Sequence, residues 1–111
     1  MSRIFKIKRK NTSPNIKYDV FPRSLILTGA TIRFKMKNAR GETVLDAPGV
    51  VLTPTENPSI GYEWQDGDTD AIGDYKAEFD VHLADGGLVT IPNDHFLIVS
   101  IGPNVPDKDE A

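Results

Sequence analysis

The sequence contains no cysteine, so neither disulfides nor thiolate metal ligands can contribute to the fold. It has no apolar run near the roughly 20 residues that a helix needs to cross a bilayer, and its charged N-terminus lacks the apolar segment of a signal peptide. The i, i+3, i+4, i+7 spacing of an amphipathic helix is also missing. These absences predict a helix-poor protein that is made in the cytoplasm, does not insert into a membrane and depends on its core for stability.

The chain of 111 residues is long enough for one domain with its own core. We expect this domain to span residues 1–102. Residues 103–111 are rich in proline and acids and have little to bury, so they are predicted to form a flexible acidic tail.

Short segments of alternating apolar and polar residues, typical of half-buried strands, recur along the chain. The clearest is residues 75–83, where Tyr75, Phe79 and Val81 share one face and Lys76 and Asp80 share the other. Turn residues separate the segments, as at Asp85-Gly86. Seven to nine such strands predict an all-β fold, an immunoglobulin-like antiparallel β-sandwich. The expected strands are residues 3–9, 16–20, 31–37, 43–45, 50–53, 60–64, 75–83, 88–91 and 96–101.

One spacing is specific to immunoglobulin-like sandwiches. Gly73 and Tyr75 follow Asp70 in the pattern D-x-x-G-x-Y, which favours a tyrosine corner, where the Tyr hydroxyl bonds backbone a few residues upstream. Trp64 is in phase with the apolar positions before it, so we expect it in the core. The predicted structural residues are Trp64, Gly73, Tyr75, Phe79 and Phe34.

Positive and negative charges are divided between the two parts of the chain. Residues 1–40 hold eleven of the 13 Lys and Arg and one acid, whereas residues 41–111 hold two bases and fifteen acids. The division fits either a basic arm for nucleic acid or oppositely charged neighbouring strands. A pI of about 5.3 disfavours nucleic acid. The alternative predicts cross-strand pairing between a basic row and an acidic row, Arg33, Lys35 and Lys37 against Glu63, Glu78 and Asp80.

No motif for metal, cofactor or catalysis is complete. Asp66, Asp68 and Asp70 begin like a calcium loop, but Ala71 and Ala77 stand where that loop needs Gly and Glu. His82 and His95 are isolated, so they are not expected to bind a metal. The serines lack a nucleophile motif and no phosphate-binding loop is present. We therefore expect a protein that is not an enzyme and binds no cofactor or small-molecule substrate.

Three segments together resemble the immunoglobulin-like amino-terminal domain of phage upper baseplate proteins and related small phage structural proteins. They are LTGATIRFKMKN at 27–38, YEWQDGDTDAIGDYKAEFDVHLADG at 62–86 and TIPNDHFLIVSI at 90–101. The resemblance implies a non-enzymatic virion component of a tail, baseplate, neck or capsid, binding other virion proteins or copies of itself. The expected contacts lie on the first strand and on the apolar strand 96–101, at Phe5, Lys6, Lys8, Leu97 and Val99.

A second hypothesis is a carbohydrate-binding adhesion module. In that case Trp64 and Tyr62 would stack on a sugar beside the neighbouring carboxylates.

Overall fold

The computed structural model describes residues 3–20, 25–92 and 97–103, and every regular element within them is a strand. The strands follow the alternating segments of the sequence closely. In chain order they are β1 (Arg3–Lys8), β2 (Ile16–Asp19), β3 (Thr31–Lys37), β4 (Thr43–Pro48), β5 (Val50–Thr53), β6 (Ser59–Tyr62), β7 (Gly73–His82), β8 (Leu88–Ile91) and β9 (Leu97–Gly102).

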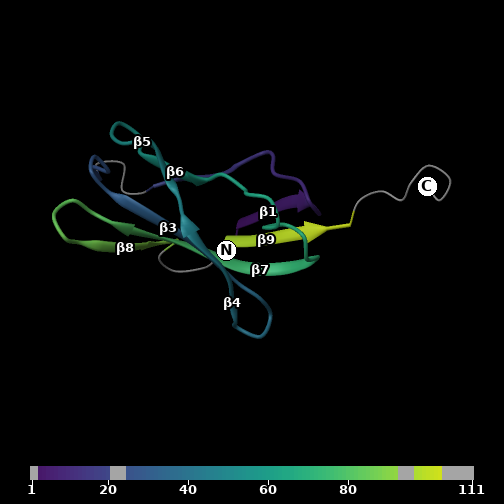
Figure 1. Ribbon diagram of the computed structural model, residues 1–111. Helices are drawn as coiled ribbons and strands as arrows, with labels where there is room; N and C mark the ends of the chain where they lie inside the picture. Colours follow the sequence, from purple (N-terminus) through teal and green to yellow (C-terminus); the bar gives the residue numbers. More distant parts are fainter. Residues whose placement is uncertain (1–2, 21–24, 93–96, 104–111) are drawn as a thin grey trace.

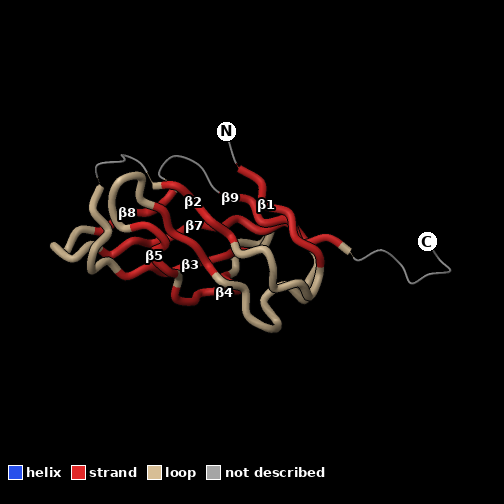
Figure 2. The backbone as a smooth tube through the Cα atoms, turned by 90° about the horizontal axis from the view of Figure 1, so that it is seen from above, coloured by secondary structure: helices blue, strands red, loops and turns tan. Residues whose placement is uncertain are grey.

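Two sheets make up the sandwich, and Figure 2 shows their strands in red. The larger has six strands in the order β1-β9-β7-β3-β4, with β8 also paired to β7; the smaller has the order β2-β6-β5. β7 is long enough to pair with β9 through its first half and with β8 through its second. The predicted immunoglobulin-like β-sandwich is therefore confirmed. One detail differs, because β1 runs parallel to β9 and makes the larger sheet mixed.

The core lies between the sheets and is built from alternate residues of each strand. On β7 the buried positions are Tyr75, Ala77, Phe79 and Val81, with exposed or half-buried residues between them. This alternation follows from the period of two, which turns successive side chains to opposite faces. The other fully buried large side chains of the core include Phe34, Ile16, Leu27, Met36, Ile60, Leu97 and Ile101.

Aromatic rings fill the middle of the core. Phe34 contacts Phe79 on the neighbouring strand at a centroid distance of 4.9 Å and stacks on Tyr62 of the other sheet at 4.7 Å. Trp64 meets Phe34 edge to face at 5.8 Å and is only 4% exposed. The structure thus places the predicted core aromatics in one cluster that joins the two sheets.

Tyr75 has the geometry of a tyrosine corner. Its hydroxyl donates a hydrogen bond to the Ala71 carbonyl oxygen at 2.8 Å, four residues upstream. Gly73, between them, has a φ of 154°. The bond fixes the segment that leads into β7, the strand that pairs with three others.

Two of the expected partner contacts are wrong. Leu97 is 1% exposed and Val99 is fully buried, because β9 lies between β1 and β7 and turns these residues into the core. Phe5 is half-buried and its ring stacks on Trp64 at 5.9 Å, so it also faces inward. Lys6 and Lys8 are exposed as expected. The expected tail beyond Pro103, as well as Phe96 and His95, lies outside the described residues.

Gly61 allows β2 and β6 to approach closely. A Cβ at this position would lie 2.7 Å from the Ile16 carbonyl oxygen and 3.0 Å from Leu52 Cδ1. We expect Gly61→Ala to lower the free energy of unfolding by roughly 1–3 kcal/mol, since the backbone must shift. A Cβ at Gly102 would meet nothing within 4 Å, so Gly102→Ala should stay within about 0.5 kcal/mol. Urea unfolding measures both, and equal effects would contradict the close approach.

Removing the tyrosine corner tests its contribution. Tyr75→Phe keeps the buried ring but deletes the hydroxyl that bonds Ala71. We expect a loss of roughly 0.5–1.5 kcal/mol in the free energy of unfolding, the usual net value of one hydrogen bond. Chemical denaturation monitored by circular dichroism checks this, and an unchanged midpoint would show that the corner does not stabilise the fold.

Candidate functional site

The first strand forms one outer edge of the six-stranded sheet. In the described part of the chain, β1 pairs with β9 and with no strand on its other side; Figure 1 shows the two strands lying together. On that side the backbone groups of β1 therefore pair with no other described strand. We call this row, contributed by Ile4, Lys6 and Lys8, the β1 edge.

Hydrogen bonding at the end of β1 shows which residues face this edge. Alternate residues of a strand direct their N–H and C=O groups to opposite sides. The Arg9 N–H donates to the Gly102 carbonyl oxygen at 2.8 Å, so odd-numbered residues face β9 and even-numbered residues face away. The Lys8 carbonyl accepts from the Asn11 N–H at 3.1 Å in the following turn. Ile4 and Lys6 thus present their peptide groups along the β1 edge.

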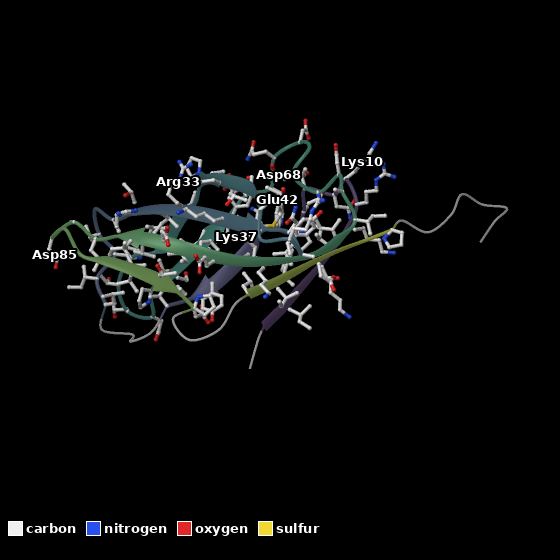
Figure 3. All side chains as sticks on the ribbon, turned by 90° about the horizontal axis from the view of Figure 1, so that it is seen from below. Lys10, Arg33, Lys37, Glu42, Asp68 and Asp85 are labelled. Carbon is white, nitrogen blue, oxygen red and sulfur yellow. The ribbon has the colours of Figure 1, made fainter. Side chains whose placement is uncertain are left out.

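Positive charge collects on and beside this edge. Lys6, Lys8, Arg9 and Lys10 are all exposed. The Arg9 Nε donates a hydrogen bond to the backbone carbonyl oxygen of Asp70 at 3.0 Å, so it is not paired with the carboxylate. The ion pairs among the described residues are all on other strands and turns. Figure 3 shows Lys10 at this end of the molecule, next to the loop that carries Asp68.

A hollow of about 460 Å³ lies against the same strand. The side chains of Lys6 and Lys8 border it on one side, and Ser100 and Gly102 of β9 lie next to them. The turn after β1 closes it with Asn11, Ser13 and Pro14. The site therefore combines an open backbone edge, unneutralised lysines and a shallow groove.

Charges on the rest of the larger sheet are largely paired with one another. Lys35 Nζ lies 2.8 Å from Asp80 Oδ2 across β3 and β7, and the Thr90 hydroxyl donates to Asp80 Oδ1 at 3.0 Å. Arg33 instead pairs with Asp46 of β4 at 2.9 Å. The predicted cross-strand pairing is thus confirmed for one pair.

Two members of the predicted charge rows do not meet as expected. Lys37 stands opposite Lys76 in the register of β3 and β7, so its neighbour across the strands is another base. Glu63 follows β6 and belongs to the smaller sheet's side of the molecule. The predicted rows carry the expected positive and negative charges, but the strand register decides which of these charges become neighbours.

The network around Asp80 changes how this carboxyl titrates. Burial alone would raise the pKa of Asp80, but the hydrogen bonds from Lys35 and Thr90, together with the charges of Lys35 and His82, hold it below its ordinary value. The same contact raises the pKa of the Lys35 ammonium. The ionised pair is therefore part of the folded structure.

The acidic loop before β7 has a structural use. Asp68 accepts hydrogen bonds from the Tyr62 hydroxyl and from the Gln65 N–H. Burial, followed by the bond to Asp68, raises the pKa of Tyr62. Within the described residues no three His, Cys, Asp or Glu side chains are grouped so that they could hold a metal ion. Asp68 thus closes the loop against Tyr62.

Sequence reasoning found Lys6 and Lys8 but missed Ile4 and the groove. Ile4 lies between Arg3 and Phe5, in the same phase as Lys6 and Lys8. Its exposure depends on the pairing of β1 with β9, which links residues far apart in the chain. The loose alternation of residues 3–9 was the only available signal. No helix long and apolar enough to cross a membrane occurs among the described residues.

The fold and site define a small immunoglobulin-like β-sandwich with one open, basic edge. No protein-family model and no curated protein matches the chain. Among solved structures it is similar to CopC from Methylosinus trichosporium OB3b. The TM-score is 0.57 and the identity 12%, over 95% of this chain and 89% of that chain. At this identity the likeness establishes the shared fold alone.

The expected role as a phage virion protein is wrong. The comparison leads to CopC and offers no support for a phage structural role. The described residues of the three sequence segments behind that expectation lie on or next to β3, β7, and β8 with β9 of the sandwich. The resemblance of these segments to the baseplate domain stays a prediction.

The carbohydrate-binding hypothesis also fails. Trp64 is 4% exposed and Tyr62 is 2% exposed, so neither ring offers a face on which a sugar could stack. The β1 edge therefore remains the best-formed candidate site.

The lowered pKa of Asp80 makes stability depend on pH. A depressed carboxyl pKa stabilises the fold above the unfolded value of about 3.8, and that contribution is lost as the pH falls through the folded value. We expect Asp80→Asn to be less stable than the parent at pH 7 and the difference to shrink below about pH 4. Urea unfolding at several pH values measures it. Asp66→Asn, in an exposed turn, is the control, and a difference independent of pH would contradict the assignment.

Proposed function

We propose that this protein is a non-enzymatic binding module whose β1 edge binds an acidic, extended segment of a partner protein. The observation that carries the proposal is the open edge of β1, lined by Lys6 and Lys8. An extended segment can add to such an edge as a further strand, with its main chain supplying hydrogen bonds and its side chains supplying specificity. The groove beside Lys6 and Lys8 gives these side chains room.

Lysines on an edge strand decide what can pair there. They oppose association of two identical edges, because Lys6 and Lys8 of one copy would meet the same bases of another. They favour a strand of opposite sign for the same reason. Charge therefore supports a distinct acidic partner over a symmetric dimer through β1.

The non-enzymatic part of the proposal rests on how the polar side chains are used. Asp80 with Lys35 and Thr90, Asp46 with Arg33, and Asp68 with Tyr62 are engaged in contacts that join strands or close loops. These groups stabilise structure. The lysines of the β1 edge are positioned for binding, because they project from the sheet into solvent.

Removing two positive charges from the edge should weaken binding. The probe is a fluorescein-labelled peptide of repeated Glu-Thr units, titrated by fluorescence anisotropy at low salt. We expect Lys6→Gln combined with Lys8→Gln to raise the Kd roughly tenfold, the effect of about 1.4 kcal/mol in lost charge pairing. Binding by the parent should weaken as salt is added, because exposed charges are screened.

The matched control removes the same charge elsewhere. Lys17→Gln with Arg40→Gln alters β2 and the turn after β3, and should change the Kd less than twofold. An equal loss in both double variants would refute a site at β1. Tighter binding of a single-stranded oligonucleotide of the same charge would overturn the assignment in favour of nucleic acid.

A further inference from the structure

An apolar spot lies at the start of the β1 edge. Ile4 is 59% exposed, among the highest values for the large hydrophobic residues. It stands directly beside Ile98 in the parallel register of β1 and β9, and Ile98 is half-buried on the same face. Two neighbouring isoleucines therefore form a small apolar surface at one end of the edge.

The lysines continue this row at fixed intervals. Ile4, Lys6 and Lys8 are alternate residues of one strand, so their side chains share the outer face at spacings of roughly 7 Å. The intervening Phe5 and Ile7 turn inward, with Ile7 buried and Phe5 on Trp64. Along the outer face of the edge, the side chains are thus apolar at the first position and basic at the next two.

We infer that the β1 edge selects an antiparallel segment of the pattern acid-x-acid-x-apolar, a specificity that rests on the proposed function. In antiparallel pairing, side chains of residues directly opposite each other lie on the same face and interact. The two acids would then stand opposite Lys8 and Lys6, and the apolar residue opposite Ile4. Antiparallel addition is chosen because it is slightly more stable per residue than parallel addition.

Backbone direction gives this inference a signature that simple charge attraction lacks. The N–H groups of Ile4 and Lys6 face the open edge, whereas those of Phe5 and Ile7 face β9. A bound strand therefore protects the even-numbered amides from hydrogen exchange and leaves the already bonded odd-numbered amides almost unchanged. Attraction between charges alone produces no such alternation.

Two peptides of identical composition test the pattern. The first, acetyl-TETETIT-amide, places both acids and the isoleucine on one face; the second, acetyl-TEETTIT-amide, turns one acid to the opposite face. We expect the first to bind roughly fivefold more tightly, the effect of one cross-strand charge pair. NMR titration of the uniformly labelled full chain gives both Kd values, and amide exchange at saturation gives the protection pattern.

Variants locate the contacts. Ile4→Ser should weaken binding of both peptides by a similar factor, since each has the isoleucine in phase. Lys6→Gln should remove most of the first peptide's advantage, because the displaced acid is the one opposite Lys6. Both residues are exposed, so the fold should persist, and Leu52→Ser on β5, also exposed, is the matched control for Ile4.

The outcomes separate this inference from the proposed function. Equal affinity for the two peptides, with binding still dependent on Lys6 and Lys8, would overturn the sequence pattern and leave acidic binding at β1 in place. Tight binding without alternate amide protection would overturn strand addition. Failure of both peptides and of the Glu-Thr probe would overturn the proposed function as well.

Discussion

The contact between Phe34 and Phe79 is the one on which most of this fold depends. These residues stand opposite each other in the register of β3 and β7, both are fully buried, and their rings lie 4.9 Å apart. Because a shift of one residue would turn every side chain of a strand to the other face, this pair sets the register of the central strands. β9 and β8 then pair with β7, and β1 with β9.

The same register determines how charge is distributed over the larger sheet. With Phe34 opposite Phe79, Lys35 lies near Asp80 and Arg33 is free to reach Asp46. Acids and bases of the outer face thus neutralise each other at the centre. β9 lies between β1 and β7, so these acids do not neutralise the lysines of β1. The β1 edge is basic because acids such as Asp46 and Asp80 pair with bases elsewhere on the sheet.

The sequence predicts what depends on neighbouring residues and misses what depends on distant ones. Alternation located β7 and β3, and the spacing before Tyr75 indicated the corner, because both are local patterns. The parallel pairing of β1 with β9 joins opposite ends of the chain, and no periodicity encodes it. Leu97 and Val99 were misplaced for this reason: an apolar strand can be covered on either face, and only its neighbours decide which.

Because Phe5 stacks on Trp64, the fluorescence of this tryptophan depends on the position of β1. Trp64 is the sole tryptophan, and the ring that covers one side of it belongs to β1. Any event that draws β1 away from the core or holds it more firmly changes the surroundings of that indole. The intrinsic emission of the unmodified protein therefore reports on its edge strand, without a label and from a position shielded from solvent.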